Sequence, residues 1–451
     1  MSASAKDLKR TLKRGDLMSM AVGQIIGSGV MVMSIAALGM TGRSVNIAFV
    51  IAAIMTCFGA LPTIFMGSTI RVLGGTYSQA AIFVGDTFAG FYMVTYIFSN
   101  MSMAMYATGL ASYLSSLIPA VANNQTIFAV IVFVAFTILN FFGTEVIAKA
   151  QNFMFYLLVI ALIMFTVFGL PRVHWAGYFG NELFGAPLMT NGFSGLLEAS
   201  TFLTYATGGA TIIVQYSAEA VNPTRDIPFV VIVSTVSVAI LYALMACVIG
   251  GVLPAEEVIA AGNLSVIAKQ IMPLPCYYFF IICGACFALG TTLNASLGWV
   301  TKPLLQATAD GWFPAFLGKL NKYKVPYIWL TIFGVVNVFA ILSGMDISML
   351  GKLVLFIGNV TGLFLVAGIF RLPKLFPEAW EKSPFHVSNG VLYLGLGCGI
   401  ALLLVQAYMN CVGQATWVII ANVVMMVVAL AYAIIMKKSG KVKVTASYEL
   451  M

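Results

Sequence analysis

Long apolar segments are the feature that most restricts what this chain can fold into. A membrane-spanning helix needs about 20 consecutive, mostly apolar residues, and such stretches recur along the whole sequence. Because 61% of the residues are hydrophobic and only 8% are charged, a water-soluble domain is excluded. We predict twelve spans, at residues 17–40, 47–70, 88–114, 126–143, 151–170, 192–219, 228–252, 276–305, 326–343, 349–370, 389–411 and 413–436.

The distribution of positive charge orients these spans. If the N-terminus lies inside the cell, most of the 23 Lys and Arg residues fall in loops that face the cytoplasm, as the positive-inside rule requires. The exceptions, in loops predicted to lie outside, are Arg43, Arg172, Lys269 and Lys352. We therefore expect a multi-pass protein of the cell membrane with two cytoplasmic tails, residues 1–15 and 437–451. The net charge of +8 reflects this orientation and does not indicate a nucleic-acid-binding surface.

Small residues interrupt two of the predicted spans. Residues 27–29 (Gly-Ser-Gly) lie in the first span, and residues 207–209 (Thr-Gly-Gly) lie in the sixth. Glycine in the middle of a membrane weakens a plain helix, but it is useful where the backbone must unwind around a ligand. Broken helices at corresponding positions of two halves are typical of transporters built from inverted repeats.

The number of spans in each half also favours an inverted repeat. Five spans precede the second break-containing span, and because five is odd, the second copy would enter the membrane from the opposite face. The predicted fold is therefore an all-α membrane protein with helices 1 and 6 broken. Its parts are a five-helix repeat at residues 16–170, an inverted repeat at 192–370 and a helix pair, helices 11 and 12, at 389–436.

The two breaks would expose backbone groups of opposite polarity. The half-helix after a break offers free N–H groups, and the half-helix before it offers free carbonyls. A zwitterionic amino acid fits such a site, with its carboxylate at the N–H groups around Ser28 and Gly29. Its ammonium group would donate to carbonyls that we expect at Ile25, Tyr205, Ala206 and Gly208. The alternative is that each triplet is only a close helix-packing patch.

Four motifs resemble the amino acid–polyamine–organocation (APC) transporter family. Residues 23–30 (Gly-Gln-Ile-Ile-Gly-Ser-Gly-Val) resemble its helix-1 motif, and residues 219–228 (Glu-Ala-Val-Asn-Pro-Thr-Arg-Asp-Ile-Pro) resemble its cytoplasmic sequence after helix 6. Residues 205–209 (Tyr-Ala-Thr-Gly-Gly) resemble the unwound segment of the L-type amino acid transporter branch, and residues 309–314 (Ala-Asp-Gly-Trp-Phe-Pro) resemble the loop after helix 8. The resemblance covers nearly the whole chain. It implies a leucine-transporter-like 5+5 fold and amino acid transport, usually by exchange.

The resemblance also implies roles for single residues. Tyr205 matches the aromatic residue that closes over the substrate from outside, although a packing or interfacial role is the alternative. Thr211 matches a polar residue that helps to set the choice of substrate side chain in relatives. The candidate substrate-binding residues are therefore Ile25, Gly27, Ser28, Gly29, Tyr205, Ala206, Gly208, Gly209 and Thr211.

Charged residues near the sixth span add candidates for gating. Glu219 and Arg225 lie at its inner end beside Asp226, where they predict either an inner gate or a plain surface ion pair. Glu198 lies seven residues before Tyr205, on the same side of the helix. It would attract cations to an outer vestibule, or else it is a solvated carboxylate.

Polar residues in other spans leave further roles open. Thr292 in the eighth span would either coordinate an ion or bridge two helices, and Asn100 in the third span would reach the pocket. Leu158 stands where some relatives carry a lysine in helix 5. We therefore do not expect a lysine side chain whose ammonium group takes the place of a bound sodium ion. The sequence of residues 115–125 contains no cysteine, so a glycoprotein heavy chain of the kind that L-type transporters bind is not implied.

Enzymes and channels are disfavoured. The two histidines, His174 and His386, lie in loops, and the seven cysteines show no ligand spacing. We expect no catalytic residue, metal or cofactor, and no segment resembles a channel filter. The expected function is secondary active transport, namely sodium-independent exchange of neutral amino acids by alternating access. The alternatives are an amino acid/amine antiporter and a proton-coupled amino acid symporter.

Overall fold

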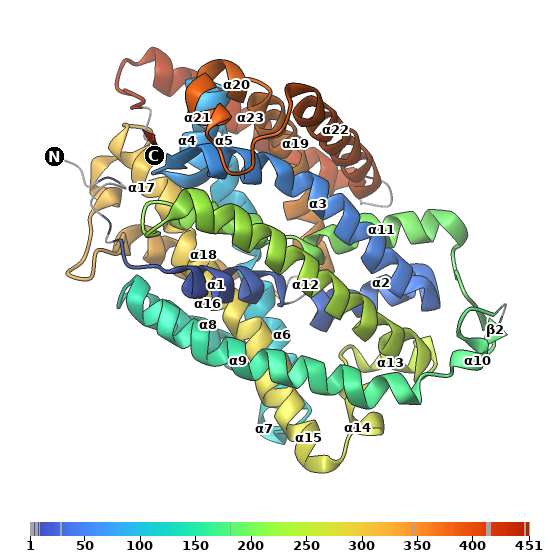
Figure 1. The fold of residues 1–451 in the computed structure, drawn as a ribbon. Helices are drawn as coiled ribbons and strands as arrows, with labels where there is room; N and C mark the ends of the chain where they lie inside the picture. The colour runs from blue at the N-terminus through green and yellow to red at the C-terminus, as the bar shows by residue number, and fades with distance from the viewer. Residues whose placement is uncertain are drawn as a thin grey trace.

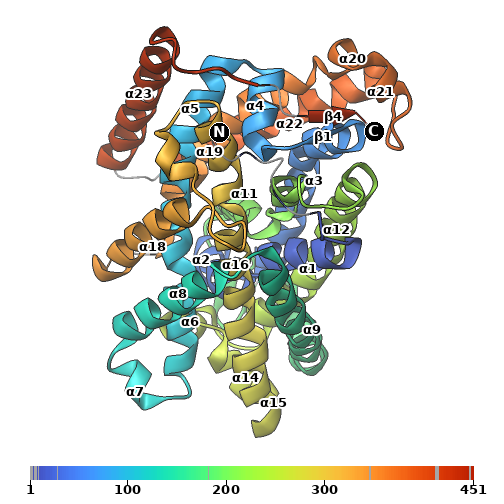
Figure 2. The same cartoon turned by 90° about the vertical axis from the view of Figure 1, so that its left-hand side faces the viewer.

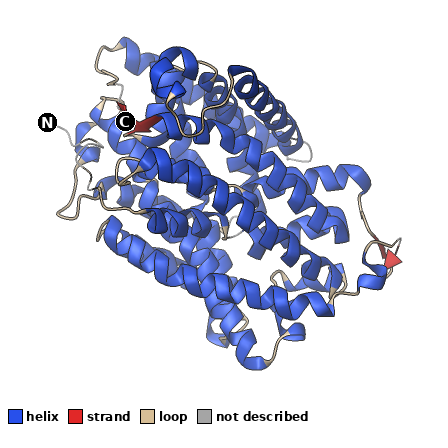
Figure 3. Ribbon diagram, in the orientation of Figure 1, coloured by secondary structure: helices blue, strands red, loops and turns tan. Residues whose placement is uncertain are grey.

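The computed structural model describes residues 4, 8, 10–27, 29–180, 182–344, 347–411, 416–445 and 448–450. Most of this part of the chain is helical (Figure 3). Its strands form two short antiparallel pairs, β1 (Ile70–Val72) with β4 (Tyr448–Leu450) and β2 (Glu182–Leu183) with β3 (Ala186–Pro187). The predicted all-α class is thereby confirmed.

The helices follow the predicted apolar segments closely. Those of the first predicted repeat are α1 (Arg14–Ile25), η2 (Gly29–Met33), α2 (Ser34–Thr41), η3 (Gly42–Ser44), α3 (Val45–Thr69), α4 (Gly75–Phe83), α5 (Asp86–Ser99), η4 (Asn100–Met103), α6 (Ala104–Ser115), α7 (Pro119–Ala122), α8 (Gln125–Asn140), α9 (Thr144–Gly169) and η5 (Leu170–Arg172). A connecting segment with α10 (Trp175–Tyr178) follows.

Helices of the remaining chain continue this pattern. They are α11 (Gly192–Thr207), η6 (Ala210–Tyr216), α12 (Pro223–Gly251), α13 (Ala255–Ala261), α14 (Ser265–Ile271), α15 (Leu274–Phe279), η7 (Phe280–Cys286), α16 (Phe287–Trp299), α17 (Thr301–Ala309), η8 (Ala315–Gly318), α18 (Tyr327–Leu342), α19 (Ile347–Ile369), α20 (Leu372–Leu375), α21 (Pro377–Glu381), α22 (Asn389–Cys411) and α23 (Thr416–Lys438).

Several helical stretches are long and apolar enough to cross a membrane. In the described residues there are six, namely Arg14–Thr69, Thr144–Arg172, Pro223–Gly251, Leu274–Ala309, Asn389–Cys411 and Thr416–Lys438. Shorter apolar helices occur at Gln125–Asn140, Tyr327–Leu342 and Phe356–Ile369. A multi-pass membrane protein is therefore confirmed, whereas the count of twelve spans and the inverted repeat stay predictions.

The chain is interrupted where the small residues predict it. α1 ends at Ile25 and the helix resumes at Gly29 as a π-helical turn, η2. α11 ends at Thr207 and a 3₁₀-helix, η6, begins at Ala210. Gly209 between them has a φ of 110°, a left-handed conformation that glycine adopts without steric cost.

The long helices run between two ends of the molecule (Figure 1). One end carries α17, together with β1 and β4, which are labelled in Figure 2, and there Arg10 contacts Glu449, so we call it the tail side. The other end carries β2 and α10. In the interior, α1 packs against α9, α12 and α16, while α3 packs along α11 and α12. The helix α23 packs on α5 at the periphery, as the view onto the tail side shows (Figure 2).

Candidate functional site

The two helix breaks meet in the interior of the bundle. A Cβ atom added at Gly29 would lie 2.6 Å from the α-carbon of Ala206, so the two backbones are in direct contact. A Cβ atom added at Gly209 would lie 3.2 Å from the carbonyl oxygen of Gln24. Breaks that are about 180 residues apart in the chain therefore lie in direct contact, the arrangement that the sequence analysis expects of a substrate site between two broken helices.

Hydroxyl groups from other helices satisfy the free carbonyls at the end of α1. The Thr292 hydroxyl of α16 donates to the Gly23 carbonyl at 2.7 Å and lies 3.3 Å from the Ile26 carbonyl. The Tyr242 hydroxyl of α12 donates to the Ile25 carbonyl at 2.9 Å. Thr292 thus bridges α16 to α1. Gly27 is required beside it, because a Cβ atom there would collide with the Thr292 hydroxyl.

A cavity of about 350 Å³ lies beside the two breaks. Of the predicted binding residues, four line it: Tyr205, Gly208, Gly209 and Thr211. Asn100 also lines it, and its side-chain amide donates to the Tyr96 carbonyl of its own helix. Four others, Ile25, Gly27, Gly29 and Ala206, are placed around the break contact instead of on the cavity wall. The predicted residue Ser28 lies outside the described residues.

The cavity wall includes two polar residues, Gln24 and Trp299, to which the sequence analysis gave no role. The indole nitrogen of Trp299 donates to the amide oxygen of Gln24 at 3.0 Å. The Gln24 amide nitrogen is 3.3 Å from the Ser296 hydroxyl oxygen. These bonds hold the end of α1 against α16 next to the cavity. Gln24 is a polar residue inside the helix-1 motif, and that position was the available signal.

The side chain of Tyr205 connects two helices at the cavity wall. Its hydroxyl is hydrogen-bonded to the hydroxyl of Tyr106 on α6, with 2.7 Å between the oxygens. Both tyrosines line the cavity. The contact therefore links α11, the first half of a broken helix, to α6. Glu198, in contrast, is half-buried on α11 and is not on the cavity wall.

A buried ion pair lies at the tail side of the broken helices. The Lys302 ammonium is 2.6 Å from the Glu219 carboxylate, and the two side chains are only 6% and 3% exposed. The Thr144 hydroxyl also donates to Glu219, at 2.6 Å. Arg225, which the sequence places beside Glu219, is exposed on α12 and forms no ion pair within the described ranges. The two carboxylates next to Arg225 in the sequence pair with other cations: Glu219 with Lys302, and Asp226 with Arg14 at 2.7 Å.

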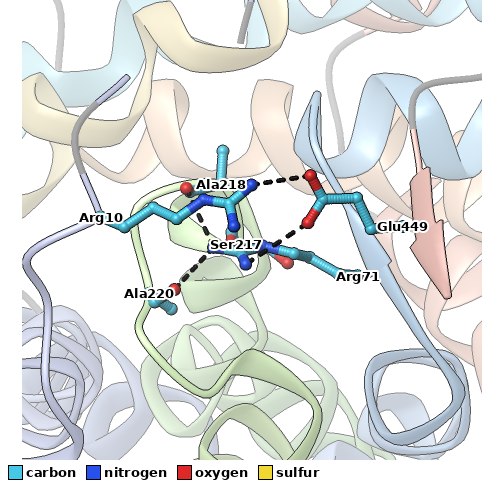
Figure 4. Close-up of polar contacts among 6 residues, drawn as sticks. All are labelled: Arg10, Arg71, Ser217, Ala218, Ala220 and Glu449. Carbon is cyan, nitrogen blue, oxygen red and sulfur yellow. Dashed lines mark hydrogen bonds and ion pairs between the residues drawn. The ribbon is translucent and has the colours of Figure 1, made fainter. Parts of the chain in front are cut away.

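The two tails converge on a second buried charge, Arg71 of β1 (Figure 4). Its side chain is 2% exposed, and its guanidinium donates to the carbonyls of Ser217, Ala218 and Ala220 just after η6. Glu449 of β4 lies 3.5 Å from Arg71 and 2.7 Å from Arg10. The C-terminal strand therefore ties the segment before α1 to the segment after η6.

Metal binding finds no support among the described side chains. No group of three or more His, Cys, Asp or Glu residues there is placed to hold a metal ion. Among the described residues that line the cavity, none has an ionised side chain. The site can therefore offer a ligand backbone groups, hydroxyls, amides and aromatic rings.

Comparison with known proteins places the sequence among permeases. The family model described as amino acid permease matches residues 12–431. The branched-chain amino acid permease BcaP of Bacillus subtilis is 24% identical, over 94% of each chain. BcaP of Lactococcus lactis is 25% identical, over 84% of this chain and 86% of its own. The methylthioribose transporter of Bacillus subtilis is 23% identical, over 73% and 74%. These relatives are named as permeases or transporters, not as enzymes.

Proposed function

Because the chain belongs to the amino acid permease family, we propose that it exchanges neutral amino acids across the cell membrane by alternating access, without sodium. The family match confirms the resemblance to APC transporters that the motifs indicate. The observation that carries the proposal is the pair of touching helix breaks beside a cavity whose described lining residues include no ionised side chain. A net charge on a substrate side chain would be costly in such a place within a membrane.

The cavity is suited to a small zwitterion. Its volume of about 350 Å³ falls at the lower end of ligand pockets, which span roughly 300–1,000 Å³. Gly208 and Gly209 present backbone to it without side chains in the way. In the proposal, the half-helix starting near Gly29 binds the substrate carboxylate, and the unwound segment after Tyr205 binds its ammonium group.

Alternating access requires one closure on each side of the site. We assign the outer closure to Tyr205 with its partner Tyr106, and the inner closure to Glu219 with Lys302. This assignment takes the tail side as cytoplasmic, and residues 16–170 and 192–370 as the two inverted repeats. Breaking and remaking the buried ion pair would accompany each opening toward the cytoplasm. Arg225, predicted as a gate residue, would act as an exposed positive charge near this closure.

Two observations support transport without sodium. The Thr292 hydroxyl is hydrogen-bonded to the Gly23 and Ile26 carbonyls, which a cation bound at the end of α1 would need as ligands. In the described part of the cavity wall, no ionised side chain accompanies these carbonyls. The alternative of an amino acid/amine antiporter would have Glu198 attract the amine, and the position of this side chain away from the cavity wall gives it no support.

Exchange in liposomes tests the proposal. The purified protein would be reconstituted with unlabelled leucine inside, and uptake of labelled neutral amino acids would be measured from outside. Leucine, isoleucine and valine come first, because two relatives are named as branched-chain amino acid permeases. We expect uptake stimulated by internal amino acid and no competition from substrates lacking the α-amino group or bearing an esterified carboxylate. Lack of uptake of every neutral amino acid would disprove the function.

A further inference from the structure

Helices outside the broken pair also bring polar side chains to the cavity. Thr235 of α12, Asn359 of α19 and Gln406 of α22 all line it. They are 3%, 7% and 6% exposed, so each is almost fully buried. Neither the sequence motifs nor the contact between the breaks accounts for them.

The packing of α19 on α22 puts two of these residues at the same level. Phe370 stacks on Tyr393 with 5.5 Å between ring centroids. Eight residues earlier on α19, a Cβ atom at Gly362 would lie 3.8 Å from the side chain of Leu403, ten residues later on α22. The helices are therefore antiparallel, and one further turn brings Asn359 level with Gln406.

Two of the three residues have polar atoms without a partner. Within the described part of the chain, neither the Thr235 hydroxyl nor the Asn359 amide nitrogen has a hydrogen-bond partner. Buried polar groups in native proteins are nearly always hydrogen-bonded, and those that are not need an explanation such as a ligand or water. Because both residues line the cavity, an occupant of the cavity would supply the missing partner.

We propose that Thr235, Asn359 and Gln406 form a subsite for the substrate side chain that prefers amide or hydroxyl groups to apolar groups of the same shape. The proposal rests on the proposed function, since it assigns a substrate class to the same cavity. The Asn359 amide nitrogen needs an acceptor, and the Gln406 amide offers both a donor and an acceptor. A neutral amide or hydroxyl meets these needs, and an ionised group does not, because the cavity-lining residues that the structure describes include no opposite charge.

Isosteric amino acid pairs test the subsite directly. Asparagine and leucine have nearly the same shape, as do threonine and valine, so competition within each pair reports hydrogen bonding. For the wild-type protein we expect the polar member to inhibit exchange at lower concentration, by about tenfold or more. Asn359→Leu and Gln406→Met should bring the asparagine-to-leucine ratio close to one, and Thr235→Val should do so for threonine and valine.

Asn410→Leu is the matched control. Asn410 lies one turn beyond Gln406 on α22 and is also buried. Its amide nitrogen has no hydrogen-bond partner among the described residues, and Asn410 is not on the cavity wall. We expect this variant to keep the wild-type ratio. Because a general structural defect lowers uptake of both members equally, the ratio separates selectivity from misfolding.

If a variant does not fold, a measurement on the wild-type protein alone still tests the subsite. Thermal stabilisation of the purified wild-type protein by asparagine and by leucine compares their binding directly. Stronger stabilisation by asparagine supports the subsite. Equal or stronger effects of leucine, or ratios unchanged in Asn359→Leu and Gln406→Met, would overturn it and leave only water as the occupant. Exchange without the polar preference rejects the subsite alone, whereas absence of any exchange rejects the proposed function.

Discussion

The α-carbon of Ala206 closes the space next to Gly29, since a Cβ atom at position 29 would lie only 2.6 Å from it. The first broken helix therefore touches the second through backbone atoms. Neither partner has a flexible side chain at this contact that could move aside. Any residue larger than glycine must push the two breaks apart, and with them the backbone groups that we expect to bind substrate.

Gly29→Val should consequently abolish exchange in a protein that still folds. The added side chain separates the breaks but leaves the long packed helices unchanged. The matched control is Gly397→Val, because Gly397 is exposed on α22 and a Cβ atom there would meet nothing within 4 Å. Exchange rates in liposomes and gel-filtration profiles should be compared for both variants. Normal uptake by Gly29→Val would place the substrate elsewhere.

Tyr205→Ala should slow exchange by about tenfold or more, because the ring that we propose as the outer lid is lost. Tyr205→Phe keeps the ring and removes only the 2.7 Å bond to Tyr106, so we expect a much smaller effect. Tyr106→Phe removes the same bond, and the double Phe variant should therefore be no slower than either single variant. If purified Tyr205→Ala exchanges at the wild-type rate, Tyr205 has only a packing role.

The sequence predicts some parts of this site and not others for physical reasons. Glycine-containing triplets locate both breaks, because local backbone preference decides where a membrane helix unwinds. The partner of Glu219 could not be found in this way. Its neighbour Arg225 is exposed, while Lys302 contacts Glu219 from the first turn of α17, 83 positions along the chain. The hydrogen bond of Trp299 to Gln24 depends on packing in the same manner.

Lys302→Met should destabilise the protein strongly, because it leaves the Glu219 carboxylate buried without its cation. Breaking a buried pair in this way typically costs about 3–5 kcal/mol. Lys437→Met is the control, since it removes an exposed pair with Asp86 whose expected contribution is below about 1 kcal/mol. Thermal unfolding in detergent measures both. Adding Glu219→Gln to Lys302→Met should restore part of the loss, and equal effects of the two lysine variants would contradict a buried inner closure.

The stability contribution of Asp310 should depend on pH. Burial raises the pKa of this carboxyl group above its ordinary value of 3.8, although donors such as Tyr77 and Thr445 oppose the shift. A raised pKa means that folding favours the protonated form. The stability that this gives is present at low pH and is lost as the pH rises from about 4 through the pKa of the folded protein. Asp310→Asn cannot titrate, so its Tm relative to wild type should increase over that pH range. A constant difference in Tm would show that Asp310 does not titrate there.

Exchange should proceed equally well in sodium and in choline media. The reason lies in Thr292, whose hydroxyl donates to the Gly23 carbonyl and lies near the Ile26 carbonyl. Because this hydroxyl already satisfies the free carbonyls at the end of α1, no bound cation is needed there. Thr292→Val should lower both Tm and exchange, and Thr292→Ser should retain most of each. Thr291→Val is a suitable comparison, since the Thr291 hydroxyl bonds to the Ala288 carbonyl of its own helix. A steep, saturable dependence of initial uptake on sodium at clamped membrane potential would contradict this prediction. In that case the Thr292 hydroxyl and the two carbonyls would be the first ligands to test.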